Sequence, residues 1–296
     1  MYIDGVFSGG GVKGFALIGA YQAIEERGLK FKRIAGTSAG SIIACLIMAG
    51  YSSKELLKIM EEIDAIQFLD PRKLLFKNPV SKWILLYFYM GLYKGEALEQ
   101  WLSVKLAEKG VVTFADLPKE SLRVVASDLS RGRILTLPDD LPVYNYDART
   151  FPVAKAIRMS CSIPYFFEPV KLKTQNGTAV IVDGGVLSNF PIWLFWGQNN
   201  LRRKERPVLG IKLSAKDENA QQNKIYNAID LFGALFETMK DAHDARYVSR
   251  KHEKDIIFIP VEHTLSTEFS LTEEKKLQLT QIGYETAKSF LKSWCY

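Results

Sequence analysis

The chain has 296 residues, of which 47% are hydrophobic and 24% are charged, and its formal net charge is +6. This is the composition of an ordinary globular protein that is long enough to bury a sizeable core. No basic stripe is interleaved with aromatic residues, so nucleic-acid binding is not favoured, and the small positive charge fits either a soluble protein or one that meets an anionic membrane surface.

The cysteine spacing indicates a protein of a reducing compartment, and the lengths of the hydrophobic runs indicate that it does not span a membrane. Cys45, Cys161 and Cys295 are widely spaced and form no C-x-x-C, which disfavours a disulfide framework or a zinc site. No secretory signal is recognisable at the N-terminus. The longest apolar runs, at 42–49 and 83–93, fall short of the ~18–20 residues of a transmembrane helix. We therefore expect a cytoplasmic protein that is at most peripheral to a membrane.

Two strand–helix pairs open the chain. Residues 2–8 ("YIDGVFS") and 31–37 ("FKRIAGT") are typical of strands, and each is followed by an apolar helical pattern, over 13–28 and 38–50. Gly28 stands where a helix-terminating glycine belongs. This alternation at a short pitch indicates parallel strands in an α/β sheet.

Further elements follow along the rest of the chain. Strands are expected at 122–129, 132–137, 179–185, 208–214 and 255–261, and helices at 53–63, 95–109, 153–160, 225–251 and 271–294. Ser270 and Glu273 predict a capping box at the start of the last helix. Because no repeat or flexible linker interrupts the chain, we expect a single domain over residues 1–296.

The glycine loop after the first strand does not fit a nucleotide site. Gly9, Gly11 and Gly14 have the G-x-G-x-x-G spacing, but a dinucleotide site also needs an acidic residue about 20 positions further on. No Asp or Glu occurs from 29 to 50. A P-loop is excluded because Lys13 is followed by glycine where Ser or Thr is required.

The second strand ends in Gly36-Thr37-Ser38-Ala39-Gly40, a G-x-S-x-G sequence between a strand and an apolar helix. This is the pattern of a nucleophile elbow, in which small residues allow a sharp turn that exposes the serine Oγ. The amide that follows the serine, here that of Ala39, is one expected oxyanion donor. The other donor would be a backbone N–H of the glycines at 9–11, which lie one βα unit upstream and have no side chain in the way. Lys13 would add positive potential or anchor the loop, unless it is a plain surface lysine.

A nucleophilic serine needs a base at neutral pH. The three histidines are His243, His252 and His263. The first two lie in or beside a charged stretch typical of a solvated helix face, whereas His263 follows a predicted strand and could reach an active site. A surface or structural role is the alternative for all three.

Asp183 is the better candidate for the base. It ends the apolar strand "AVIVD" and is followed by Gly184 and Gly185, so the chain can bend toward the edge that carries Ser38. A plain Asp-Gly turn is the alternative.

Three motifs thus occur in order: G-G-G-x-K-G, G-T-S-A-G and D-G-G. Together they closely resemble the patatin-like phospholipase family. Residues 160–169 ("SCSIPYFFEP") are similar to the block that precedes the catalytic strand of that family, and 266–287 to its closing helix. The resemblance is firm over residues 1–191 and loose beyond them. We expect a patatin-like catalytic core at 5–196, with residues 197–296 completing the fold.

The resemblance implies a three-layer α/β/α fold with a central, mostly parallel sheet. It also implies a lipid acyl hydrolase of the phospholipase A or lysophospholipase type that works through a Ser–Asp dyad and an acyl-enzyme. Carried over, it makes Ser38 the nucleophile and Asp183 the general base. The implied oxyanion hole consists of Gly9, Gly10, Gly11 and Ala39, and the motif-supporting residues are Lys13, Gly14, Gly36, Gly40, Gly184 and Gly185. Lys13 replaces the usual Arg of the family and lacks the planar guanidinium group that can make two parallel hydrogen bonds.

The expected partner is a lipid or phospholipid, with no nucleotide, cofactor or metal, because no H-E-x-x-H or calcium-loop pattern occurs. Residues 76–93 ("FKNPVSKWILLYFYMGLY") are dense in aromatics and leucine and would contact a membrane peripherally or line an acyl channel; a buried core element is the alternative.

Two other function classes stay open. A Ser-His-Asp esterase or thioesterase would use His263 or His243, whereas an acyltransferase would need a histidine directly before the serine, where Thr37 stands. A non-catalytic lipid-binding module would keep only the fold.

Overall fold

The computed structural model describes residues 1–62, 65–72, 86–175, 177–196, 206–215, 225, 231, 233–236, 238–239, 253–261 and 271–295. Its main sheet has the strand order β10-β9-β1-β2-β4-β8-β7, with β5 also paired to β4. The bounds of these strands are β1 Tyr2–Phe7, β2 Lys30–Thr37, β4 Leu122–Asp128, β5 Arg133–Leu137, β7 Val170–Thr174, β8 Gly177–Asp183, β9 Val208–Ala215 and β10 Ile256–Val261. A small second sheet pairs β3 (Gly91–Tyr93) with β6 (Tyr165–Phe167).

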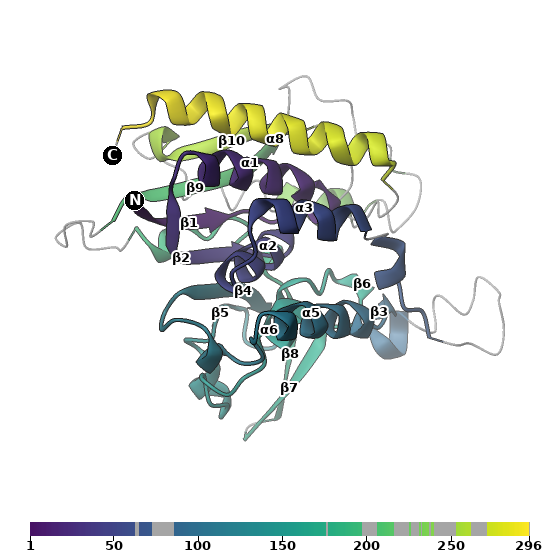
Figure 1. Cartoon of the computed structure of the whole chain (residues 1–296). Coiled ribbons are helices and arrows are strands. Elements are labelled where there is room, and N and C mark those ends of the chain that lie inside the picture. The colour runs from purple at the N-terminus through teal and green to yellow at the C-terminus, as the bar shows by residue number, and fades with distance from the viewer. Residues whose placement is uncertain are drawn as a thin grey trace.

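The helices flank this sheet, as Figure 1 shows. Their bounds are α1 Gly14–Glu26, α2 Ala39–Met48, α3 Ser53–Glu62, α5 Glu96–Glu108, α6 Val153–Ser160 and α8 Glu273–Ser293. The strands from β10 to β4 run parallel to their neighbours. β5 and β8 are antiparallel to β4, and β7 is antiparallel to β8. The prediction of a central, mostly parallel sheet flanked by helices is confirmed.

The antiparallel strand β8 meets β2 end to end. The last residue of β2, Thr37, pairs with Val125 of β4, and the last residue of β8, Asp183, pairs with Ala126. Because β5 occupies the other edge of β4 over this stretch, β2 and β8 must lie on the same side of β4. The carboxyl ends of the two strands therefore meet at neighbouring positions of β4, about 3.3 Å apart along the strand.

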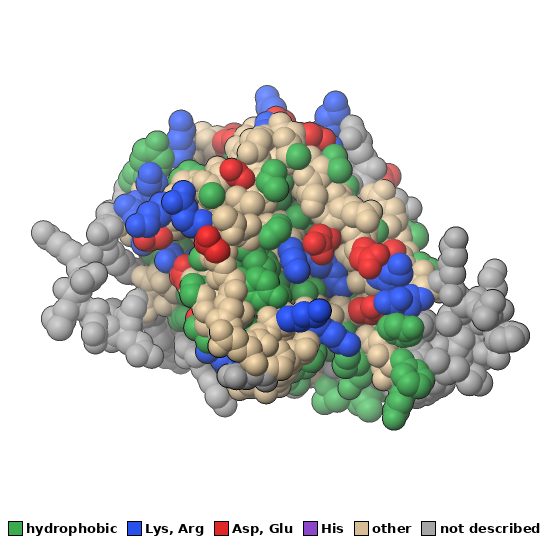
Figure 2. Space-filling view, turned by 90° about the horizontal axis from the view of Figure 1, so that it is seen from below, with side chains coloured by type: hydrophobic (Ala, Val, Ile, Leu, Met, Phe, Trp, Pro, Cys, Tyr) green, Lys and Arg blue, Asp and Glu red, His purple; other side chains and the backbone are tan. Residues whose placement is uncertain are grey.

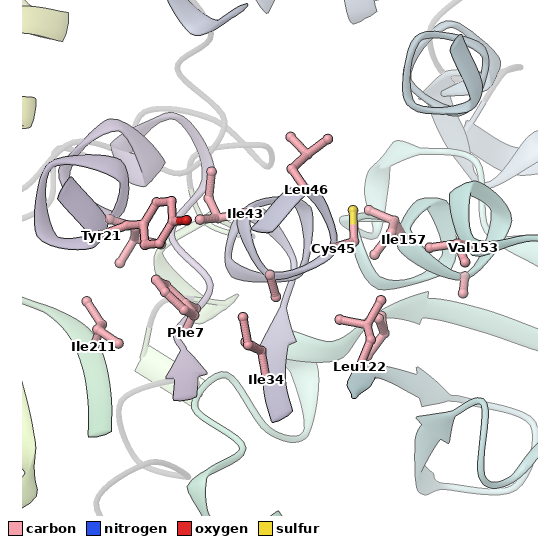
Figure 3. Packing of buried hydrophobic residues seen from close by; sticks show 14 of the residues in the cluster. Phe7, Tyr21, Ile34, Ile43, Cys45, Leu46, Leu122, Val153, Ile157 and Ile211 are labelled. Carbon is pink, nitrogen blue, oxygen red and sulfur yellow. The ribbon is translucent and has the colours of Figure 1, made fainter. Parts of the chain in front are cut away.

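The core lies between the sheet and the helices α1, α2 and α6 (Figure 3). Side chains alternate across a strand, so Phe7 faces these helices whereas Val6 faces the opposite side. Figure 3 shows strand residues beneath helix residues in one continuous layer, with the labelled members Phe7, Ile34, Leu122, Ile211, Tyr21, Ile43, Cys45, Leu46, Val153 and Ile157. On the opposite side Val6 packs in a smaller cluster with Phe190, Ile192, Val208 and Ile256.

The last helix, α8, packs along α1 across the top of the view in Figure 1. Its N-cap is Thr272, whose side chain accepts a hydrogen bond from the Lys275 N–H at 3.3 Å. The predicted capping box of Ser270 and Glu273 is therefore wrong: the nearer hydroxyl of Thr272 caps the helix, and Glu273 is its first residue. The helix predicted over 225–251 lies largely outside the described residues. Among the helices that can be described, none has the length and apolarity needed to cross a bilayer.

Candidate active site

Ser38 occupies the sharp turn between β2 and α2. Its backbone has φ 51° and ψ −126°, a conformation that L-residues rarely adopt and that must be held by its surroundings. The Ser38 N–H donates to the Ser160 Oγ at 2.8 Å, and the Ser38 carbonyl accepts from the Ser41 Oγ at 2.6 Å. The turn is thus fixed on both sides of the serine, whose side chain stays at the start of α2.

The two glycines of the elbow allow three backbone segments to approach closely. A Cβ at Gly36 would lie 2.5 Å from the Gly40 carbonyl oxygen, across the turn. A Cβ at Gly40 would lie 2.5 Å from the carbonyl oxygen of Phe7, at the end of β1. Real side chains do not tolerate such contacts. Both glycines are therefore required for α2 to leave the sheet at this angle, close above β1.

Asp183 lies at the end of β8, where this strand meets β2. Its side chain is buried, and its Oδ1 accepts a hydrogen bond from the Gly185 N–H at 2.7 Å. Beyond it, the Ser188 carbonyl accepts from the Thr37 Oγ1 at 2.9 Å. A Cβ at Gly184 would lie 2.8 Å from the Thr37 Cγ2. The loop that follows Asp183 is thereby held directly against the residue that precedes Ser38.

The glycine loop approaches both motifs. A Cβ at Gly9 would lie 3.3 Å from the Ser38 Cβ, and the Gly9 N–H donates to the Asn189 carbonyl at 3.0 Å. The Gly9 amide is thus engaged in tying the loops together. Gly11 has φ 56°, in the left-handed region that favours glycine. Lys13 is buried, so it is not a plain surface lysine.

Cys161 is a shared neighbour of the serine and the aspartate. Its thiol lies near enough to the side chains of Ser38, Ser41 and Asp183 for all three to affect its pKa. Burial above all, and then the Asp183 carboxylate, raise the pKa of this thiol well above its ordinary value. Cys161 therefore stays protonated at neutral pH and does not compete with Ser38 as a nucleophile.

Ser38 opens into a pocket of about 110 Å³ that is partly open to solvent. The lining is predominantly apolar, as in sites for small apolar ligands. It consists of Gly11, Val12, Gly14, Phe15, Ser38, Ala39, Ile42, Ile43, Phe68, Leu98, Trp101, Cys161, Ile163, Phe167, Leu271 and Lys276.

Ser160 links the elbow to β4, and removing its hydroxyl is expected to weaken the fold. Its Oγ accepts from the Ser38 N–H and donates to the Val125 carbonyl at 2.6 Å, with no solvent exposure. Ser160→Ala removes both of these hydrogen bonds and leaves the buried Ser38 N–H without its partner, which costs about 1–3 kcal/mol. Urea denaturation should show this loss, whereas Ser103→Ala, on the exposed face of α5, should leave the midpoint unchanged. Equal midpoints for the two variants would contradict this role.

The structure thus brings the three sequence motifs together: the second and third end side by side on Val125 and Ala126, and the glycine loop lies against Ser38. The histidines His243, His252 and His263 lie outside the described residues, and so does most of 76–93. Sequence reasoning did not assign roles to Ser160, Asn189 or Lys276. The only sequence signal for Ser160 was its position at the start of the "SCSIPYFFEP" stretch, and the sequence offers none for the other two. No group of three or more potential metal-binding side chains occurs in the part of the chain that is described.

The sheet thus carries a serine elbow and a buried aspartate at adjoining strand ends, on β2 and β8. The family model for patatin-like phospholipases matches residues 5–196. The chain therefore belongs to the patatin-like phospholipase family, a family of lipid hydrolases.

Two relatives and one solved structure illustrate the range of this similarity. The protein YqhO of Bacillus subtilis is 53% identical over 296 residues, which cover 100% of both chains. Triacylglycerol lipase ptl3 of Schizosaccharomyces pombe is 29% identical over 195 residues, 64% of this chain and 38% of the lipase. Among solved structures, VipD of Legionella pneumophila has a TM-score of 0.58 at 18% identity, covering 99% of this chain and 67% of VipD, which supports the fold alone.

Proposed function

We propose that the protein is a serine carboxylic-ester hydrolase that releases fatty acids from phospholipids or lysophospholipids, with Ser38 as nucleophile and Asp183 as general base. The observation that carries this proposal is the meeting of β2 and β8 at Val125 and Ala126. It places an elbow serine and a buried carboxylate at adjoining strand ends, beside an apolar pocket.

The chemistry follows from these positions. The Ser38 Oγ attacks the ester carbonyl carbon while its proton passes to Asp183, and the alcohol part leaves with that proton. Water then attacks the acyl-enzyme, losing a proton to Asp183, and Ser38 recovers its proton as the fatty acid departs. The amide of Ala39 and those of Gly10 and Gly11 would bind the oxyanion. In this proposal the Gly9 N–H does not bind the oxyanion, because it already donates a hydrogen bond to the Asn189 carbonyl.

The pocket suits the acyl chain of such a substrate. Phe68, Leu98, Trp101 and Phe167 contribute large apolar side chains to the same cavity as Ser38. Each methylene group transferred from water into such surroundings contributes about 0.8 kcal/mol. An acyl ester would thus be bound by its chain, with its carbonyl beside Ser38.

Peripheral membrane contact is part of the proposal. Within 76–93 the described residues include a helical turn at 86–89, where Tyr87 and Phe88 expose 82% and 66% of their surface. These residues are therefore not part of a buried core. The Arg72 guanidinium lies 4.0 Å from the centre of the Tyr89 ring and is also ion-paired with Glu168, which steadies the base of the turn. Figure 2 shows exposed hydrophobic side chains at the lower right edge of the molecule, with others in the middle and at the upper left of a face that carries charges of both signs.

Replacing the two exposed aromatics is expected to weaken binding to lipid vesicles. The double variant Tyr87→Ser and Phe88→Ser should lower the partition into vesicles roughly tenfold or more, because two aromatic side chains no longer enter the interface. Vesicle co-sedimentation measures this, with hydrolysis of a water-soluble ester as a check that the active site is intact. Val143→Ser, which also replaces an exposed apolar residue (58%), is the matched control. Equal partition of both variants would rule out this docking segment.

The proposal is tested by covalent labelling. A fluorophosphonate probe is expected to modify Ser38, which peptide mass spectrometry identifies, and the labelled protein should no longer release fatty acid from phospholipid vesicles. Labelling of Ser38 without hydrolysis of any lipid by the unlabelled protein would retain the nucleophile and reject the lipid substrate. Absence of labelling would favour the non-catalytic lipid-binding module.

A further inference from the structure

The end of α6 holds the backbone of both residues of the proposed dyad. The Ser160 Oγ accepts a hydrogen bond from the Ser38 N–H at 2.8 Å. Two residues further on, the Ser162 carbonyl accepts a hydrogen bond from the Asp183 N–H, also at 2.8 Å. The three-residue segment 160–162 therefore bridges the elbow and the end of β8, and its position sets that of Asp183 relative to Ser38.

Asp183 depends on this segment because β7 does not extend as far as the end of β8. Val170, the first residue of β7, pairs with Ile181, so the last two residues of β8 lie beyond β7. The Ser162 carbonyl takes the place of a neighbouring strand and accepts the Asp183 N–H. A shift of residues 160–162 would consequently move the end of β8 as well.

Arg158 fixes the position of this segment. Its guanidinium group donates hydrogen bonds to the Ser162 Oγ and to the carbonyls of Lys94 and Glu168, the last at 2.7 Å. The Ser162 hydroxyl in turn donates to the Arg158 carbonyl at 2.8 Å. Because Lys94 directly follows β3 and Glu168 directly follows β6, Arg158 joins the end of α6 to the small second sheet.

The guanidinium group of Arg158 is tightly enclosed. The residue is only 3% exposed, and its Cζ lies 5.4 Å from the centre of the Phe167 ring. Gly95 has φ 74°, and a Cβ at this position would collide with the guanidinium group. A buried charge is costly unless it is hydrogen-bonded, and the planar guanidinium can serve three acceptors at once, which an ammonium group at the same place cannot.

We propose that Arg158 is a positioning residue of the active site: by holding Ser162 in place, it keeps the Asp183 carboxylate in position to accept the proton of Ser38. This inference rests on the proposed hydrolase function. It requires no contact between Arg158 and the substrate, because the effect passes through the hydrogen bond between the Ser162 carbonyl and the Asp183 N–H.

The test measures hydrolysis of the water-soluble ester p-nitrophenyl butyrate by Arg158→Lys, with kcat expressed per folded molecule. We expect kcat to fall roughly ten- to hundredfold, the order of loss for a reacting group misplaced by about 1 Å. KM should stay within about twofold of the wild-type value, since ester binding by the apolar pocket is kept. Arg123→Lys, which alters the surface ion pair with Asp139, is the matched control and should match the wild type.

Ser162→Ala is a milder second variant that removes only the hydroxyl between the guanidinium and the segment 160–162. It should lower kcat in the same way, by roughly tenfold, whereas Ser103→Ala on the exposed face of α5 should not. If Arg158 acts through Ser162, the two losses do not multiply, and the double variant is no slower than Arg158→Lys alone. The rate of Ser38 labelling by fluorophosphonate should fall in proportion to kcat.

Wild-type kcat per folded molecule in both variants, even with lowered stability, would overturn the inference and leave Arg158 as a purely structural link. Losses that multiply in the double variant would overturn it as well. If Arg158→Lys does not fold, Ser162→Ala decides, and its wild-type kcat would reject the positioning role. If the wild type hydrolyses no ester and Ser38 resists the probe, the proposed hydrolase function itself fails and the inference falls with it.

Discussion

Asp183→Asn is expected to reduce fatty-acid release roughly 10²–10⁴-fold, the usual contribution of a general base. The asparagine Oδ1 can still accept the Gly185 N–H that holds the native side chain at 2.7 Å, so the local structure is kept. An amide cannot take the proton of Ser38, however, and the serine stays a poor nucleophile. Steady-state hydrolysis of phospholipid vesicles measures the loss, and thermal unfolding checks that the fold persists.

Asp139→Asn is the matched control for this change. Its carboxylate is 46% exposed and pairs with Arg123 at 2.7 Å on the surface, away from the motifs. Surface pairs of this kind contribute at most about 1 kcal/mol, so both activity and stability should resemble those of the wild type. Asp183→Asn with near-wild-type activity would mean that another group acts as the base.

Gly40→Ala is expected to damage both the fold and the active site. The added Cβ would lie 2.5 Å from the Phe7 carbonyl oxygen, which belongs to a buried strand and cannot move aside cheaply. Forcing α2 away from β1 should cost about 1–3 kcal/mol of stability. The shift also displaces Ser38, and misplacing a reacting group by about 1 Å lowers the rate on the order of 10²-fold.

Gly14→Ala is the comparison for this second change. A Cβ at Gly14 would lie 3.4 Å from the Ala39 Cβ, an ordinary contact, in the same region of the molecule. Urea denaturation and ester hydrolysis of the two variants should therefore differ clearly, with Gly14→Ala close to the wild type. Equal behaviour would show that the close approach of α2 to β1 is not what Gly40 provides.

Local patterns predicted the elements that carry the motifs. The β2 strand, the elbow and the apolar helix α2 follow from "FKRIAGTSAGSIIACL", because period, turn chemistry and glycine spacing agree along one short stretch. The helices α5 and α6 were predicted within a residue at each end for the same reason.

Features that depend on contacts between distant parts of the chain could not be predicted from local sequence patterns. The pairing of Asp183 with Ala126 is a register between strands separated by 57 positions, and the direction of β8 is not encoded in its own sequence. The three-residue strands β3 and β6 are too short to show a period. Lys276 lines the pocket of Ser38 because α8 packs along α1, a tertiary contact that the local sequence of α8 does not reveal.

The dyad is best tested by measuring fatty-acid release from phospholipid vesicles by the wild type, Ser38→Ala, Asp183→Asn and His263→Ala under identical conditions. We expect release to be lost in the first two variants and kept in the third, with all four proteins folded. Release that disappears in His263→Ala while Asp183→Asn retains it would contradict the dyad and assign the base to a histidine.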